Sequence, residues 1–420
     1  MFDHLSSFSL CFLAVLVLMI ILRCWLGARH ISHILAHRGM VPSQFADRIQ
    51  LSAHQKAADY SVIRTRFARL SLTVEVAVLL AFTFGGGLQA LHGFWSSHLE
   101  GLWYGVAMIF SVVAVSGIVD LPLSLYIQFV IEEKFGFNRM TLRLFFIDFV
   151  KQLVLGLIIG IPVLLTVLWL MGRMGELWWL YVWLFWCAFN LLIMFVYPTW
   201  IAPLFNKFTP LEDAALKERI ETLLTRCGFS SSGLFVMDGS KRSNHGNAYF
   251  TGFGKTKRIV FFDTLLNRLQ PQEIEAVLAH ELGHFKHRHI VKRIAIIFSM
   301  TLFLLFALGQ LMQTEWFYVG LGVAEESARN TAMALILFFL IVPVFTFLLT
   351  PLGSVFSRHH EFEADRYAAK HASADDLIKA LVKLYEDNAA TLTPDPLHSL
   401  FYDSHPPAAL RISRLSSEPN

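Results

Sequence analysis

Charged residues are scarce in this sequence, and long apolar runs occupy much of it. Asp, Glu, Lys and Arg together make up 16% of the 420 residues, whereas hydrophobic residues make up 55%. This balance is too apolar for a soluble globular protein, so the composition indicates a membrane protein that crosses the bilayer several times. The net charge is only +3. Its basic residues concentrate in the connections between apolar runs, and nothing in their pattern indicates nucleic-acid binding.

Cysteine is also sparse, with four residues that show no paired spacing: Cys11, Cys24, Cys187 and Cys227. The pattern therefore predicts neither a disulfide framework nor a thiolate metal site. Internal repeats and low-complexity tracts are absent from the sequence. No Lys or Arg precedes the first apolar run, and it lacks a small-residue cleavage site. We therefore expect a retained membrane helix there and not a cleaved signal peptide.

Seven apolar stretches are long enough to cross a bilayer, which takes about 20 residues in a helix. They lie at 8–27, 69–92, 102–131, 149–172, 177–201, 292–313 and 331–353. The third and fifth are long enough to tilt or to extend beyond the bilayer.

The distribution of basic residues predicts the orientation. The connection from about 28 to 68 carries six Lys and Arg residues, whereas the next one, "HGFWSSHLEG", carries none. By the positive-inside rule the first connection is cytoplasmic and the amino terminus lies outside. The segment after the fifth span and the carboxyl tail are then both cytoplasmic.

The predicted fold is mainly α, with a small α+β portion on the cytoplasmic side. We expect spans one to five within 1–201, a first cytoplasmic portion at 202–291, spans six and seven within 292–353, and a tail at 354–420 that completes the site. In the first portion, "GLFVMD", "NAYFTGFG" and "KRIVFFD" predict strands, the last two forming a hairpin near "GKTK".

The stretch "AVLAHELGHFKHRH", residues 276–289, carries the pattern of a metal site. Residues four apart share one face of a helix, so His280 and His284 can bind a single ion. Glu281 would lie against the same ion without binding it, where it can deprotonate a water molecule. Pro271 suits the first turn of this helix. The alternative interpretation is a cytoplasmic helix with surface histidines.

A catalytic zinc needs a third protein ligand and an open fourth position. The metzincin pattern would place glycine at 287 and histidine at 290, but the sequence has His287 and Ile290, which excludes that class. We expect His287 and His289 to be solvated or structural, because a third ring from the same helix turn rarely reaches the ion.

The better donor lies in "SRHHEFEADRYA", a predicted helix on the same side of the membrane. Glu361 and Asp365 are four apart and share a face, whereas Glu363 points elsewhere. We assign Glu361 as the third ligand and Asp365 as the carboxylate that orients a histidine ligand. An ordinary amphipathic charged helix is the alternative.

These motifs together resemble a known family. "HELGH", "SRHHEFEAD", "NAYF", "KRIVFFDTL" and "SHPPAALRI" are similar to stretches of the M48 zinc metallopeptidases. "KAADYSVIRTRF", "EEKFGFNRMTLRLFF" and "PTWIAPLFNKFTPL" resemble its Ste24 branch, the CAAX prenyl proteases, so the resemblance covers most of the chain. The related HtpX branch is similar around the metal, but it has fewer spans and lacks these amino-terminal stretches.

The resemblance implies one Zn²⁺ per chain and a role for each matching residue. It implies that the zinc ligands are His280, His284 and Glu361 and that the general base is Glu281. By the same resemblance, Asp365 is the carboxylate that supports a ligand, His405 in "SHPP" is the oxyanion donor, and Arg411 is a further support. The strand edge that receives the peptide would include Asn247 and Ala248. Without the family, His405 would be an ordinary loop residue and the strand a buried part of the hairpin.

The resemblance also implies a chamber enclosed by the seven helices and substrates that are prenylated or embedded in the bilayer. Polar residues within the spans, Glu75, Asp120 and Asn190, suit a wet interior or pairing between helices. The chain lacks the long insertions of eukaryotic relatives and ends in "SSEPN" without a retrieval signal, so we expect a bacterial inner-membrane protein. Alternative functions are an HtpX-type quality-control protease, a zinc-containing channel, and an inactive scaffold.

Overall fold

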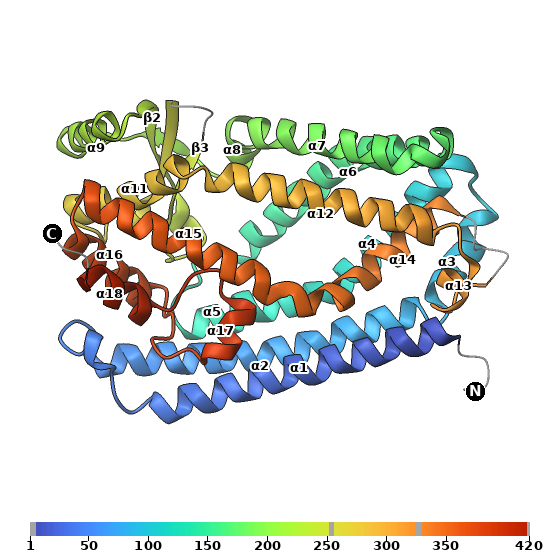
Figure 1. Ribbon diagram of the computed structural model, residues 1–420, viewed down its shortest axis with the longest axis horizontal. Coiled ribbons are helices and arrows are strands. Elements are labelled where there is room, and N and C mark those ends of the chain that lie inside the picture. Colours follow the sequence, from blue (N-terminus) through green and yellow to red (C-terminus); the bar gives the residue numbers. More distant parts are fainter. Residues whose placement is uncertain (1–5, 252–255, 325–329, 418–420) are drawn as a thin grey trace.

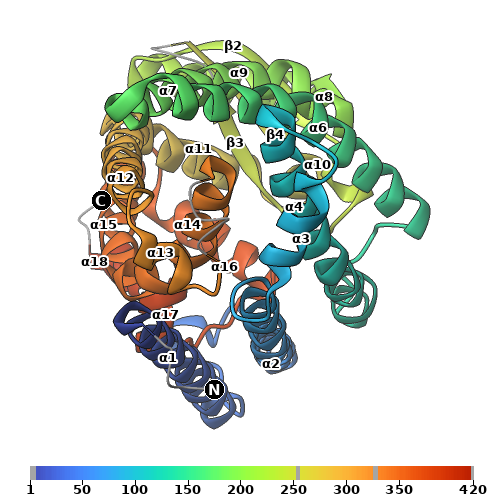
Figure 2. The same ribbon diagram turned by 90° about the vertical axis from the view of Figure 1, so that its right-hand side faces the viewer.

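The computed structural model describes residues 6–251, 256–324 and 330–417, and most of them are helical. The helices that carry the apolar runs are α1 Ser7–His37, α2 Leu51–Phe82, α3 Gly87–Ser96, α4 Gly101–Tyr126, α6 Leu142–Arg173, α7 Trp178–Val196, α12 His289–Leu311 and α14 Thr331–Thr346 (Figure 1). Seen along their length, they are arranged as a ring (Figure 2). Within the described ranges, six helices are long and apolar enough to cross a membrane, or seven if one bent pair counts as a span. The mainly helical, multi-span fold is confirmed.

The second span differs from the expected straight stretch at 69–92. The apolar run is divided between α2 and α3, which are bent by 50° relative to each other. Gly85, Gly86 and Gly87 lie at the break, and Gly86 has a φ of 76°. A residue with a side chain rarely adopts that conformation, so the glycines permit the bend. On its amino-terminal side, α2 continues beyond the apolar run through a more polar segment that begins at Leu51.

The third and fifth spans are longer than a bilayer requires. They run over Gly101–Lys134 and Gly175–Phe205, which are 34 and 31 residues, or about 50 and 45 Å at the helical rise per residue. Each contains a π-helical turn near its end, at Ile127–Ile131 and Tyr197–Ile201. Short helices, α5 Glu132–Lys134 and α8 Ala202–Phe205, complete them.

The seventh span continues directly into the last portion of the chain, which follows the membrane helices. α14 passes through a 3-10 turn at Phe347–Leu349 into α15 Thr350–His371. The two helices and this turn count as one helical stretch of 41 residues, Thr331–His371. The expected boundary between 353 and 354 therefore falls inside a continuous helix.

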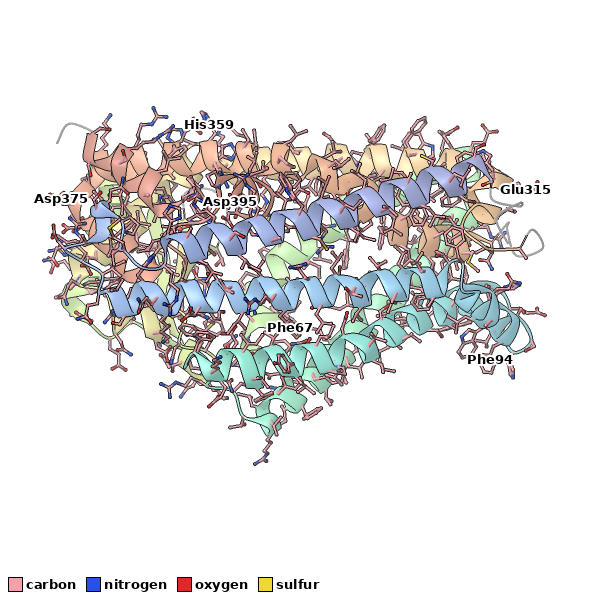
Figure 3. The ribbon with its side chains drawn as sticks, turned by 90° about the horizontal axis from the view of Figure 1, so that it is seen from below. Phe67, Phe94, Glu315, His359, Asp375 and Asp395 are labelled. Carbon is pink, nitrogen blue, oxygen red and sulfur yellow. The ribbon has the colours of Figure 1, made fainter. Side chains whose placement is uncertain are left out.

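The portion outside the membrane helices combines a mixed sheet with short helices at one end of the bundle. The strands are β1 Phe208–Pro210, β2 Ser230–Met237, β3 Ala248–Thr251 and β4 Thr256–Phe262, in the order β1-β2-β4-β3. The helices are α9 Ala214–Cys227, α10 Asp263–Leu266, α11 Pro271–Lys286, α16 Ala374–Asp387, α17 Pro396–Tyr402 and α18 Ala408–Ser417, while α13 Glu315–Val319 lies at the opposite end. β3 and β4 form the expected antiparallel hairpin, although its turn at 252–255 lies outside the described residues. Asp375 and Glu315 mark the two ends of the molecule in Figure 3.

Each part has its own apolar core, and an ion pair joins them. One core lies among the long helices around Phe12 and Met108, and the other lies between the sheet and α9, α11 and α16 around Leu282. Between them, Arg242 after β2 donates two hydrogen bonds to Asp148 in α6, of 2.8 and 3.1 Å. Both side chains are mostly buried, so this pair fixes the sheet against the membrane helices.

Candidate metal centre

α11 begins with strong local signals. Gln270 caps it, the Glu273 carboxylate accepts a hydrogen bond from the backbone N–H of Gln270, and Pro271 occupies the first turn. This capping box satisfies backbone groups that the helix itself leaves without partners. The helix then presents His280, Glu281 and His284 over its last two turns.

α11 packs closely against α15 because Gly283 has no side chain. A Cβ on Gly283 would come within 2.9 Å of the Ala364 Cα and 3.0 Å of the Tyr367 Cβ. Such distances are shorter than carbon atoms tolerate. The glycine thus lets α15 bring its carboxylates next to the histidines of α11.

His280, His284 and Glu361 converge at this contact. The Nε2 atoms of His280 and His284 are 3.2 Å apart, and they lie 3.5 and 3.4 Å from the two carboxylate oxygens of Glu361. Zinc bound tetrahedrally at 2.0 to 2.1 Å separates its ligand atoms by about 3.3 to 3.4 Å. The spacing of the three side chains therefore matches a zinc site with a fourth position left open.

The Glu361 carboxylate supports the same conclusion. Its Oε2 is fully buried and has no hydrogen-bond partner among the described residues. A buried oxygen without a partner is costly. Two imidazole nitrogens and a carboxylate form a donor set that zinc prefers, so a cation here would satisfy Oε2.

Asp365 and Arg411 hold His280 from behind. Asp365 Oδ1 lies 2.9 Å from His280 Nδ1, and Arg411 donates from Nε and a terminal nitrogen to the two oxygens of Asp365. Burial works against the charged form of His280, but its contacts with the carboxylates of Asp365 and Glu361 outweigh burial and raise its pKa to about 9. Asp365 likewise raises the pKa of Arg411, against the effect of burial. The surrounding carboxylates thus favour positive charge at this point.

His284 is connected by hydrogen bonds to His289 and Glu363, which the sequence analysis did not assign to the site. Its Nδ1 lies 3.0 Å from Nδ1 of His289, and Nε2 of His289 lies 2.8 Å from Glu363. His289 is buried. The available signal was the run of histidines in "HFKHRH", but residues 284 and 289 would point apart on an uninterrupted helix.

Glu281 follows His280 directly in α11, and His405 lies beside Glu361. Glu281 is half-buried, and no hydrogen bond or ion pair to its carboxylate occurs in the part of the chain that the structure describes. His405, in the loop between α17 and α18, has an exposed side chain whose Nε2 lies 3.5 Å from Glu361. A base and a hydrogen-bond donor are therefore available beside the proposed metal position.

β3 is the outermost strand of the sheet on the side of β4. Ala248 pairs with Phe261, and the carbonyl of Asn247 accepts a hydrogen bond from the backbone of Phe262. Among the described strands, none pairs with the other edge of β3. That edge can accept an extended peptide.

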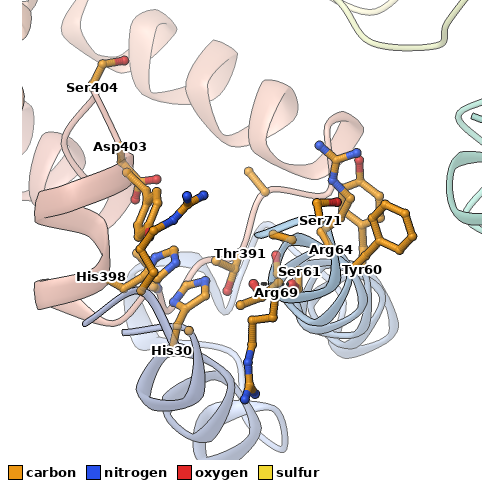
Figure 4. Close-up of a pocket in the computed structure, with 18 of the residues that line it drawn as sticks. His30, Tyr60, Ser61, Arg64, Arg69, Ser71, Thr391, His398, Asp403 and Ser404 are labelled. Atoms are coloured by element: carbon orange, nitrogen blue, oxygen red, sulfur yellow. Dashed lines mark hydrogen bonds between the residues drawn. The ribbon is translucent and has the colours of Figure 1, made fainter. Parts of the chain in front are cut away.

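One cavity borders the site at His405, and a second cavity adjoins the first. The first, about 770 Å³, is lined at one end by Tyr385 and His405 and elsewhere by Arg23 and Glu75. Figure 4 shows part of its lining, including His30 from α1, Arg64 from α2 and Thr391 from the loop that follows α16.

The second cavity, about 540 Å³, shares Arg23, Leu72, Glu75 and Tyr402 with the first. Asp120 also lines it. Two of the three polar span residues therefore face a hollow interior, whereas Asn190 donates to the Trp186 carbonyl of its own helix.

Comparisons with known proteins agree with this geometry. Residues 30–207 match the family described as "CAAX prenyl protease N-terminal, five membrane helices", and residues 210–419 match "Peptidase family M48". CAAX prenyl protease 1 of Saccharomyces cerevisiae is 43% identical over 319 residues, which cover 72% of this chain and 70% of the yeast protein. The human CAAX prenyl protease 1 homolog is 35% identical over 426 residues, covering 90% and 89%.

The similarity extends to the whole fold. The crystal structure of Ste24p from S. mikatae superposes with a TM-score of 0.90 at 32% identity, covering 98% of this chain and all of that one. The chain therefore belongs to peptidase family M48, in the branch of the Ste24 CAAX prenyl proteases.

Proposed function

We propose that this chain is an integral-membrane zinc endopeptidase that hydrolyses peptide bonds in prenylated or membrane-embedded substrates. The observation that carries the proposal is the triangle formed by His280, His284 and Glu361, whose edges of 3.2 to 3.5 Å match one zinc ion. One Zn²⁺ per chain is held by these three residues, and the buried Oε2 of Glu361, which has no hydrogen-bond partner among the described residues, supports the assignment.

Each residue around the ion has a separate task. When bound, zinc supplies a Lewis acid that polarises the scissile carbonyl and makes water acidic enough to attack near neutral pH. Glu281 accepts the proton of the attacking water and passes it to the leaving amine. His405 donates a hydrogen bond to the oxyanion. Asp365 and Arg411 keep the His280 ring in place.

The peptide lies along the free edge of β3, which includes Ala248 and directly follows Asn247. The second cavity accepts the hydrocarbon part of the substrate, because apolar side chains form much of its wall. These are Met19, Leu72, Val76, Val78, Leu79, Phe339, Leu340, Pro343, Val344 and Phe347. Its overlap with the cavity that reaches His405 provides a route between a lipid chain and the metal.

The protein is placed in a bacterial inner membrane, with its amino terminus outside and its metal centre in the cytoplasm. The charge distribution of the loops supports this orientation, and the start of α1 lies at the opposite end of the molecule from α11 (Figure 1). The functional division follows the chain: 1–201 and 292–353 form the membrane part, and 202–291 and 354–420 form the metal centre.

Cleavage of a farnesylated CAAX peptide by the purified protein in detergent tests the proposal. Zinc content is measured on the same sample, and Glu281→Gln is assayed alongside. We expect cleavage that requires both zinc and Glu281. Cleavage of unprenylated membrane proteins only would favour HtpX-type quality control, and a folded, zinc-loaded protein that cleaves neither would favour a channel or scaffold.

A further inference from the structure

A second group of metal-type side chains lies directly behind His284. His289, His360 and Glu363 have ligand atoms within 4.8 Å of one another. The rings of His289 and His360 stack at 3.9 Å with an angle of 13° between them. His289 and His360 are buried, with exposed fractions of 4% and 7%. Neither the proposed ligands nor the proposed base includes any of these side chains.

A series of hydrogen bonds connects this group to the proposed metal centre through His284. Nδ1 of His284 lies 3.0 Å from Nδ1 of His289, and Nε2 of His289 lies 2.8 Å from Oε2 of Glu363. Nε2 of His284 faces the other two proposed ligands. To bind a metal it carries no hydrogen, so the neutral ring has its hydrogen on Nδ1.

That tautomer determines the direction of the other hydrogen bonds in this group. The Nδ1–H of His284 donates to Nδ1 of His289, and the Nε2–H of His289 donates to the carboxylate of Glu363. Both donors and both acceptors are then satisfied. A second metal at His289, His360 and Glu363 would instead have to displace the Nε2 hydrogen and break the 2.8 Å bond.

The backbone bends specifically to make this contact. In an uninterrupted helix, residues 284 and 289 would point about 140° apart. Arg288 interrupts it with φ 56° and ψ 33°, a left-handed conformation that residues with side chains seldom adopt. This residue ends α11 and starts α12 in a new direction, which returns the His289 ring to His284.

We propose that His289 and Glu363 are a positioning pair for the metal ligand His284. They fix its tautomer and ring orientation, and the Glu363 charge strengthens the imidazole as a donor. This inference rests on the proposed metal site. His289 touches neither the metal nor the substrate, so its effect is on metal affinity before it is on turnover.

The zinc affinity of the full-length protein in detergent tests this pair. It is measured by competition with a chromophoric chelator, and the number of bound zinc ions is determined on the same sample. We expect His289→Ala and Glu363→Ala each to weaken zinc binding about 10-fold to 100-fold. Glu363→Gln keeps an acceptor without the charge and should lose less. The double variant should lose little more than either single one, because both act through one ring. His359→Ala is the matched control, since that ring is exposed and only 3.6 Å from the other Glu363 oxygen.

Other outcomes overturn the inference in distinguishable ways. Wild-type affinity in folded Glu363→Gln and Glu363→Ala would exclude the pair and leave the metal site intact. A second bound zinc that disappears in His360→Ala would make the group a metal site of its own. A wild-type protein that binds no zinc would remove the proposed function as well. Glu363→Gln keeps the test valid if His289→Ala fails to fold, and fluorescence-detected gel filtration checks folding.

Discussion

Gly283 in α11 and Ala364 in α15 approach so closely that a Cβ on the glycine would lie 2.9 Å from the Ala364 Cα. This contact sets the distance between the histidines and Glu361, because the two helices carry opposite halves of the triad. A methyl group at 283 would therefore separate the ligands.

We expect Gly283→Ala to lose most of its zinc and to unfold more easily by about 1 to 3 kcal/mol, the usual cost of overpacking. The gain in helix propensity of up to about 1 kcal/mol offsets only part of that. Thermal unfolding in detergent and zinc content measure both effects. Gly156→Ala in α6 is the control, because nothing lies within 4 Å of its added Cβ. Full zinc content in Gly283→Ala would show that the contact does not set the ligand spacing.

Glu281→Gln should keep its zinc and its stability while kcat falls about 10²-fold to 10⁴-fold, the range of general-base catalysis. The reason is that this carboxylate binds no other described side chain, so the amide changes only proton transfer. Peptide cleavage and zinc content check the result. Glu218→Gln, on the exposed face of α9, is the control and should leave kcat unchanged. If Glu281→Gln cleaves at the wild-type rate, another group is the base.

Asp365→Ala should cost both stability and zinc affinity. It leaves the guanidinium of Arg411, which is 5% exposed, without its main partner, and an unpaired buried charge costs about 3 to 5 kcal/mol. It also frees the ring of His280. Urea unfolding measures the loss of stability, and competition with a chelator measures the loss of zinc affinity. The exposed Asp375 in α16 provides the comparison, since Asp375→Ala should cost less than about 1 kcal/mol and no zinc affinity.

The protein should become less stable as the pH falls from about 6.5 towards 4, in part through His398. Burial, assisted by the charge of neighbouring His30, lowers the pKa of His398 to about 4. Between these pH values the unfolded chain binds a proton that folded His398 does not, so protonation favours unfolding.

The His398 ring stacks on His30 at 3.8 Å, and Asp395, Arg29, His33 and Asp403 lie around the pair. His398→Phe keeps a ring for stacking and cannot titrate. We expect its melting temperature to fall less between pH 7 and pH 5 than that of the wild type. Identical slopes in the two proteins would assign the pH dependence to other groups.

Local patterns predicted the parts of the site that depend on helical periodicity. The spacing of His280 and His284, and of Glu361 and Asp365, determined which side chains share a face, and the structure brings both faces together. The hairpin of β3 and β4 followed in the same way from strand composition.

Features that depend on one backbone angle or on contact between distant segments were beyond such patterns. His289 reaches His284 only because Arg288 is left-handed, and a left-handed arginine has no sequence signature. The role of Gly283 depends on Ala364, which follows two intervening membrane helices. The bend after α2 did have a signal in three consecutive glycines, but the apolar run through them favoured a straight span.

The proposed ligands His280 and His284 precede α12, and Glu361 lies near the end of the continuous helical stretch Thr331–His371 that includes α14. The proposed donor set is thus divided by a membrane-crossing helix pair, and a bound metal would connect its two ends. The metal centre is also not a detachable module, because no soluble fragment of consecutive residues contains all three ligands.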